Sequence, residues 1–219
     1  MVSVTKLHLG CGQRYLDGYI NIDFPLVEHS VQDSSIADIH ADILGLTNSL
    51  ESIDEVRLHH VFEHFPRPIA CALLASWYSW LKPGGVLHVE VPDFSKTAKI
   101  MLNPFCSFKK RAVAERHLFG SHEARWAMHC EGYTPMMLKN MLSVFGFQII
   151  RAKKNVWCGT CNVEVVALKS ENAVTMEIFV SRADTYLRNF LIDNSEQEMR
   201  IHAVWMDSFS SQLKKGWAL

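Results

Sequence analysis

Leu7-His8-Leu9-Gly10-Cys11-Gly12 is the stretch of sequence that decides the fold of this chain. A short apolar run leads at once into a G-x-G turn, which is typical of a buried strand that ends at a ligand site. In an open α/β sheet, the carboxyl end of such a strand and the free N–H groups after it point into one crevice. The stretch therefore predicts a strand over residues 6–9 and a nucleotide-binding turn. A tight structural turn is the alternative, because Tyr15 stands where a dinucleotide fingerprint would have its third glycine.

Short apolar runs alternate with longer helical patterns from this stretch to about residue 169. The helix predicted over residues 68–81 has apolar side chains at three- and four-residue spacing, and the run Lys82-Pro83-Gly84-Gly85 ends it. Strands are predicted over residues 6–9, 19–22, 36–40, 55–60, 86–91, 147–152 and 162–168. This order predicts an α/β fold in which helices wrap a parallel sheet.

Two helical regions lie outside this alternation. Residues 94–132 are rich in charge and aromatic side chains without a strand pattern, so we expect a helical lid insertion over one edge of the sheet. A further helix is predicted from Thr134, a good N-cap, with Pro135 in its first turn. After residue 170, two amphipathic stripes predict a helical tail that could pack on the sheet, cover the site or form a homodimer. We therefore divide the chain into a domain over residues 1–169 and a helical extension over 170–219.

Composition and charge exclude several classes of protein. With 219 residues, 48% hydrophobic and 21% charged, the chain is large enough for one core and too apolar for a disordered protein. Lys and Arg total 22 against 23 for Asp and Glu, which argues against nucleic acid as the partner because no bulk positive charge is present. The first residues lack an export signal, and the longest uncharged apolar run, 68–81, is too short to span a bilayer. We therefore expect a cytoplasmic protein without membrane insertion.

Six cysteines have no spacing typical of a disulfide scaffold, so we expect reduced thiols. Cys158 and Cys161 form a C-x-x-C pair, but a structural zinc ion would need two further ligands at matching spacing. Ordinary loop cysteines are the simpler interpretation of this pair.

Two carboxylates follow predicted strands. Asp23 ends the second strand, where a carboxylate can accept both ribose hydroxyls of a bound nucleoside. Asp42 follows the third strand, where it can accept a hydrogen bond from an exocyclic amine such as that of adenine. Each is an ordinary surface acid when taken alone. Together with the glycine turn, they predict a nucleoside-binding edge of the sheet.

In combination, these motifs resemble those of the class I S-adenosylmethionine-dependent methyltransferases. Leu7-His8-Leu9-Gly10-Cys11-Gly12 is similar to the family's first motif, Tyr19-Ile20-Asn21-Ile22-Asp23 to its second and Ala41-Asp42-Ile43 to its third. His60-Val61-Phe62-Glu63-His64 and Leu81-Lys82-Pro83-Gly84-Gly85-Val86-Leu87 correspond to the segments around the fourth and fifth strands. The resemblance covers residues 6–168 and is greatest to the methyltransferase type 11-like subgroup of polysaccharide and small-molecule methylation. It implies a Rossmann-like, seven-stranded, mostly parallel sheet with helices on both faces, and S-adenosylmethionine as the cofactor.

The resemblance also implies roles for individual residues. The implied cofactor-binding residues are Gly10, Cys11 and Gly12 for the methionyl and ribose groups, Asp23 for the ribose hydroxyls, Asp42 and Ile43 for the adenine, and His60 beneath the sulfonium. One departure from the family is the spacing, since only 13 positions separate Gly10 from Asp23. The helix that the family places between the first two strands must therefore be reduced to a turn or two.

The chain has 11 histidines, and histidine both titrates near neutrality and binds metals. In some families of this fold, a Glu-x-x-Glu-His motif and a later His ahead of a Thr-led helix bind a divalent metal that holds the acceptor hydroxyl. Here the set is His60, Glu63, His64 and His129, which is softer and better suited to zinc or iron than to magnesium. A metal-free alternative makes His64 or His129 a general base that Glu63 orients. In a third alternative, Glu63 and His64 only cap the following helix and hold the loop together. We favour the metal-free base.

The resemblance therefore implies an enzyme that transfers a methyl group from S-adenosylmethionine to a small-molecule or saccharide acceptor, most readily at a hydroxyl. Methylation of an amine or carboxyl group is one alternative, and a non-catalytic relative that keeps the fold as an interaction module is another. The basic run Lys109-Lys110-Arg111 would suit a phosphorylated acceptor, although a solvated helix face explains it more simply.

Overall fold

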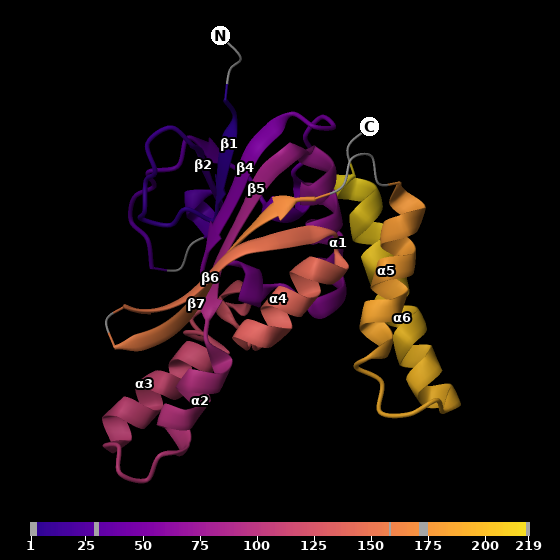
Figure 1. Ribbon diagram of the computed structural model, residues 1–219. Helices are drawn as coiled ribbons and strands as arrows, with labels where there is room; N and C mark the ends of the chain where they lie inside the picture. Colours follow the sequence, from indigo (N-terminus) through magenta and orange to yellow (C-terminus); the bar gives the residue numbers. More distant parts are fainter. Residues whose placement is uncertain (1–3, 29–30, 158, 171–174, 218–219) are drawn as a thin grey trace.

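The computed structural model describes residues 4–28, 31–157, 159–170 and 175–217 (Figure 1). These residues form a seven-stranded sheet in the order β3-β2-β1-β4-β5-β7-β6. The strands are β1 Lys6–Leu9, β2 Ile20–Asp23, β3 Ile39–His40, β4 Ile53–His59, β5 Leu81–Pro92, β6 Phe147–Trp157 and β7 Thr160–Lys169. Strand β7 runs antiparallel to β5 and β6, and the other neighbouring pairs are parallel. The predicted α/β fold with a seven-stranded, mostly parallel sheet is confirmed.

The helices agree with the sequence pattern in place and order. They are α1 Arg67–Trp80, α2 Phe94–Leu102, α3 Phe108–Phe119, α4 Pro135–Val144, α5 Met176–Arg188 and α6 Glu196–Gly216, with short 3-10 turns η1 Leu26–Glu28, η2 Ile43–Gly45, η3 Phe62–His64 and η4 Arg125–Ala127. Thr134 caps α4 as expected, because its side chain accepts a hydrogen bond from the backbone N–H of Met137. Within the described ranges, no helix is long and apolar enough to cross a membrane.

Helix α1 is buried because it lies between the sheet and the tail helix α6 (Figure 1). The side chains of Trp77 and Trp80 are fully inaccessible to solvent. Helix α6 approaches closely, since Trp80 Nε1 donates to the Gly216 carbonyl at 2.8 Å and a Cβ on Gly216 would lie 2.6 Å from Ser76 Oγ. The sequence left the role of the tail open, and the structure shows that its helix α6 packs on α1. Apolar side chains of α5 and α6 belong to the same core as the sheet, and a domain boundary at residue 170 stays a prediction.

The face of the central strands that points away from α1 carries polar side chains that hydrogen bonds join in series, called the polar chain below. Arg57 can only donate, so its Nε–H bonds to His59 Nε2 at 3.3 Å, and His59 Nδ1 is left to donate to His8 Nε2 at 3.1 Å. His8 then donates from Nδ1 to Asn21 Oδ1 at 3.0 Å. Burial and nearby arginine charges hold the pKa of His59 at about 3, so these histidines are neutral.

This polar chain holds the segment between β1 and β2. Residues 10–19, all of them described, contain turns and no helix, as the short spacing predicted. Asn21 Nδ2 donates to the carbonyls of Leu16 and Tyr19 at 3.1 and 3.2 Å, so side-chain hydrogen bonds fix a loop where the resemblance implied a shortened helix. Helix α3 reaches the same face at β7, where His117 Nε2 lies 3.0 Å from Asn162 Oδ1.

Element boundaries differ most from the sequence pattern at the β6–β7 hairpin, β3 and β5, while β2, β4 and α1 shift by one or two residues. The β6–β7 hairpin is longer than predicted, because cross-strand pairing continues to Val156 and Cys161 beyond the apolar runs. Strand β3 has only two residues. Strand β5 starts at Leu81, since a register shift in β4 lets Ile53 pair with Leu81 ahead of the glycine pair. Cys161 is buried in β7, whereas Cys158 of the C-x-x-C pair lies outside the described residues.

Candidate active site

The turn after β1 requires glycine at its first position. Gly10 has φ +66°, and a Cβ there would lie 2.3 Å from Val61 Cγ2. The backbone N–H groups of Gly10 and Cys11 donate to the Ile22 carbonyl at 2.8 and 3.0 Å, which joins the turn to β2. The turn and the end of β2 therefore form one rigid unit.

Asp23 is held at the carboxyl end of β2 and is 7% exposed. Its Oδ2 accepts from the N–H of Gly12 at 2.8 Å and its Oδ1 from the N–H of Phe24 at 2.9 Å. Asp42 lies beyond β3, where its Oδ1 accepts from the N–H of Leu44 and caps η2. The two carboxylates thus have fixed positions after neighbouring strands, as the sequence predicted.

A cavity of about 380 Å³ opens at this edge of the sheet. Six of the seven residues predicted to bind the cofactor line it: Gly10, Gly12, Asp23, Asp42, Ile43 and His60. Cys11 is buried and is not among the lining residues.

Aromatic side chains that the sequence did not assign to the cofactor form another part of this cavity. Phe24 and Trp126 line it, with ring centroids 6.4 Å apart, and Trp126 Nε1 donates to the Glu28 carbonyl at 3.0 Å. The position of Phe24 directly after Asp23 is a signal that could have placed it here. Trp126 arrives from the 94–132 insertion, so only the tertiary structure could place it.

His60 follows β4 in the left-handed backbone region, with φ +54°, and its N–H donates to the Glu90 carbonyl at 2.9 Å. Its ring lies between two carboxylates, with Nδ1 3.4 Å from Glu63 Oε1 and Nε2 3.6 Å from Glu90 Oε1. Burial alone would lower the pKa of His60, but the two carboxylates outweigh it and raise the pKa to about 9. The His60 side chain lowers the pKa of Glu90 to about 2. The three side chains together carry a net negative charge at neutral pH.

Glu63, His64 and His129 form a second cluster, in which one ligand atom from each lies within 4.8 Å of the others. Glu63 is 1% exposed, and neither carboxylate oxygen accepts a hydrogen bond from any residue that the structure describes. Burial would raise the pKa of Glu63, yet the neighbouring histidines lower it, so the carboxylate is charged. The His60 imidazolium, 3.4 Å from Glu63 Oε1, offsets part of this buried charge, and a ligand or metal ion could offset the rest.

Both histidines of this cluster have a defined tautomer. His64 Nδ1 lies 3.1 Å from the Met128 carbonyl and His129 Nδ1 lies 3.2 Å from the Leu118 carbonyl. A carbonyl can only accept, so Nδ1 carries the proton and Nε2 keeps its lone pair in each neutral ring. Main-chain carbonyls, and not Glu63, therefore orient the two imidazoles, while Glu63 Oε1 lies 4.0 Å from His129 Nε2.

The cluster forms because the end of the 94–132 insertion packs against the 3-10 turn η3. The N–H groups of Cys130 and Glu131 donate to the Glu63 carbonyl at 2.8 and 3.1 Å. Gly120 pairs with Met128 just before this return and needs to be glycine, because its Cβ would lie 2.1 Å from the Ala127 carbonyl oxygen. His129 is thereby placed beside residues that precede it by more than 60 positions.

A second cavity of about 440 Å³ adjoins the first and shares His60, His64 and Trp126 with it. Its wall also includes His129 from the cluster, together with Arg116 and His117 of α3. Burial lowers the pKa of His117, for which the sequence gave no role, so its ring is neutral. An acceptor in the second cavity would therefore lie next to the cofactor cavity, at the place where the two cavities share His60 and His64.

The seven-stranded sheet has the Rossmann-like fold of the class I S-adenosylmethionine-dependent methyltransferases. The chain is similar to such a methyltransferase from Methanosarcina mazei, with 16% identity over 77% of this chain and 93% of that one and a TM-score of 0.50. It is also similar to the 1,6-didemethyltoxoflavin-N1-methyltransferase of Burkholderia thailandensis, solved with bound 1,6-didemethyltoxoflavin and S-adenosylhomocysteine. The identity is 14% over 76% of this chain and 71% of that one, with a TM-score of 0.52. No protein-family model and no curated protein matches the sequence.

Proposed function

We propose that this chain binds S-adenosylmethionine in the 380 Å³ cavity and transfers its methyl group to an acceptor in the adjoining cavity. The observation that carries the proposal is the fixed carboxylate of Asp23 beside a turn that requires Gly10. A carboxylate at this place can accept ribose hydroxyls, and the open backbone can approach the ligand. The carboxylates of Glu63 and Glu90 offset the positive charge of His60, which lines the cavity and would otherwise repel the sulfonium.

The adjoining cavity supports a hydroxyl acceptor on a small molecule or saccharide. The free Nε2 atoms of His64 and His129 can each accept a proton, which a hydroxyl must lose when its oxygen takes the methyl group. A general base of this kind contributes on the order of 10²–10⁴-fold in rate, and positioning of the two reactants contributes the rest. Amine or carboxyl acceptors remain the alternative reaction.

The Glu63 cluster also fits a divalent metal. One buried carboxylate without hydrogen bonds and two imidazoles with proton-free Nε2 atoms are a donor set suited to zinc or iron. The carbonyls of Met128 and Leu118 hold the Nδ1 protons, as the outer partners of metal-binding histidines do. A bound metal would lower the pKa of an acceptor hydroxyl.

Calorimetric titration with S-adenosylmethionine and S-adenosylhomocysteine tests the proposed function. We expect both to bind and Asp23→Ala to weaken binding at least tenfold, because the ribose hydroxyls lose a charged acceptor. Asp33→Ala is the matched control, since Asp33 is exposed and does not line the cavity. If neither compound binds the wild-type chain, the methyltransferase proposal is wrong and the interaction-module alternative gains.

Release of S-adenosylhomocysteine over a panel of saccharides, alcohols, amines and carboxylic acids identifies the acceptor class. With the acceptor found, His129→Ala and a chelator separate the two chemistries. If both abolish turnover and leave cofactor affinity unchanged, a metal holds the acceptor. If only His129→Ala does so, histidine is the base. His40→Ala, at an exposed histidine outside both cavities, is the control.

A further inference from the structure

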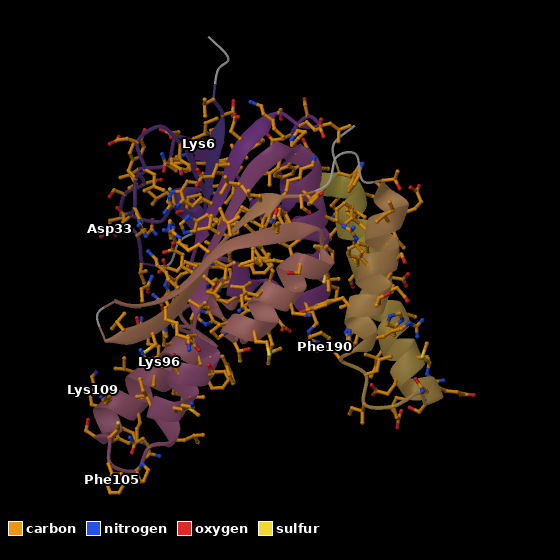
Figure 2. The ribbon with its side chains drawn as sticks, viewed as in Figure 1. Lys6, Asp33, Lys96, Phe105, Lys109 and Phe190 are labelled. Carbon is orange, nitrogen blue, oxygen red and sulfur yellow. The ribbon has the colours of Figure 1, made fainter. Side chains whose placement is uncertain are left out.

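The hairpin of α2 and α3 projects away from the sheet (Figure 1). Its tip exposes large apolar side chains. The exposed fractions of Leu102, Phe105 and Phe108 are 71%, 96% and 84%. Figure 2 shows Phe105 at the end of the hairpin farthest from the sheet. Three large apolar side chains on one protruding loop mark a surface that contacts something other than water.

The structure of the loop holds these side chains outward. Asn103 Oδ1 accepts from the N–H of Phe105 at 2.9 Å, and the Ser107 side chain caps α3 through the N–H of Lys110. Arg111 Nε donates to the Met101 carbonyl at 2.9 Å and ties the start of α3 to the end of α2. The exposure of the tip therefore follows from a defined hairpin.

The hairpin behind this tip carries a charged collar, which extends from Lys109 near the tip to Lys96 near the sheet (Figure 2). Residues 94–119 contain a single acidic residue, Glu115, although the whole chain has a formal net charge of -1. The basic residues of the hairpin, all exposed, are Lys96, Lys99, Lys109, Lys110, Arg111 and Arg116. Within the described part of the chain, none of them forms an ion pair, so their charge is available to a partner.

We propose that the α2–α3 tip docks the protein on an anionic membrane surface. Leu102, Phe105 and Phe108 would enter the headgroup layer, and the lysines behind them would meet lipid phosphates. A planar, deformable surface accepts a convex apolar tip and its charged collar together. A single-stranded nucleic acid fits less well, because it needs aromatic platforms along a groove and Leu102 offers no ring for stacking. The docking does not depend on the methyl transfer proposed above.

Co-sedimentation with lipid vesicles tests this proposal. We expect the wild-type chain to bind vesicles of phosphatidylcholine and phosphatidylglycerol in equal parts, to bind pure phosphatidylcholine poorly, and to lose affinity as salt rises. The pair Phe105→Ser/Phe108→Ser and the pair Lys109→Glu/Lys110→Glu should each reduce partitioning about tenfold or more. Unchanged thermal unfolding and S-adenosylhomocysteine affinity would show that these variants fold.

Matched controls use the other end of the molecule. Ile192 is 90% exposed, and Lys214-Lys215 is an exposed lysine pair on α6. Ile192→Ser and Lys214→Glu/Lys215→Glu should leave vesicle binding within twofold of wild type. The proposal is overturned if the wild type does not bind anionic vesicles, if the control pairs reduce binding equally, or if the phenylalanine pair has no effect. Binding to a single-stranded oligonucleotide without binding to vesicles would assign the surface to nucleic acid instead.

Discussion

Two adjacent histidines at the end of β4, His59 and His60, are in opposite protonation states. On the polar sheet face, burial and arginine charges hold the pKa of His59 at about 3. At the candidate active site, burial is outweighed by Glu63 and Glu90, which raise the pKa of His60 to about 9. His60 lies just after β4 with φ +54°, so its ring meets the carboxylates of Glu63 and Glu90. The His59 ring instead meets Arg57 and His8. The comparison shows that the neighbours supplied by the fold decide the charge of each histidine.

The two regions also differ in how their polar atoms are satisfied. On the sheet face, Arg57, His59, His8 and Asn21 each supply the donor or acceptor that the next one lacks. At the active site, the Glu63 carboxylate accepts no hydrogen bond from the residues that the structure describes. The hydrogen-bonded chain stabilises the fold, whereas the Glu63 carboxylate, paired with His60 only at 3.4 Å, keeps acceptor capacity for a ligand.

The double variant Glu63→Gln/Glu90→Gln should have the largest effect, because it removes both negative charges that lie beside His60. Without the carboxylates, burial dominates, and the pKa of His60 should fall from about 9 to below its ordinary value of 6.5. Histidine titration by NMR, on protein treated with a chelator, measures the change. A His60 pKa that stays above 8 would show that other groups hold its proton.

His59→Leu should lower the free energy of unfolding by roughly 1–3 kcal/mol, because it leaves a buried acceptor on His8 and a donor on Arg57 unpaired. Affinity for S-adenosylhomocysteine should stay within twofold of wild type, since His59 does not line the cofactor cavity. Urea unfolding and calorimetry measure the two quantities. A large loss of affinity would contradict the separation of the two regions.

Glu90→Gln should have the smallest effect, which appears as a change in pH dependence. His60 has a folded pKa above its unfolded value, so its contribution to stability is complete below pH 6.5 and is lost as pH rises to about 9. Because the His60 side chain is 34% exposed, we expect a loss on the order of 1 kcal/mol in the wild type. In Glu90→Gln this loss should be smaller. Parallel unfolding curves at pH 6 and pH 9.5 measure it, and equal losses in both proteins would contradict the assignment.

Much of the fold could be predicted because its signals are local. The glycine turn at Gly10, the carboxylate of Asp23 after β2 and the cap at Thr134 each depend on a few neighbouring residues. Boundaries such as the long β6–β7 hairpin could not be predicted, because pairing with the partner strand extends them past the apolar pattern. Phe24 had a local signal in its position after Asp23, whereas Trp126 had none.

The sequence by itself determined the order of strands and helices, the turn that needs glycine and the carboxylates that follow β2 and β3, since these depend on short-range sterics and periodicity. Only the tertiary structure decided the charge of His60, the burial of the Glu63 carboxylate without hydrogen bonds and the packing of the tail on α1. It also brought His129 back to η3 and the apolar tip away from the sheet. These properties depend on which distant groups come within a few ångströms, because burial and electrostatic interaction vary with distance in space and not with separation in sequence.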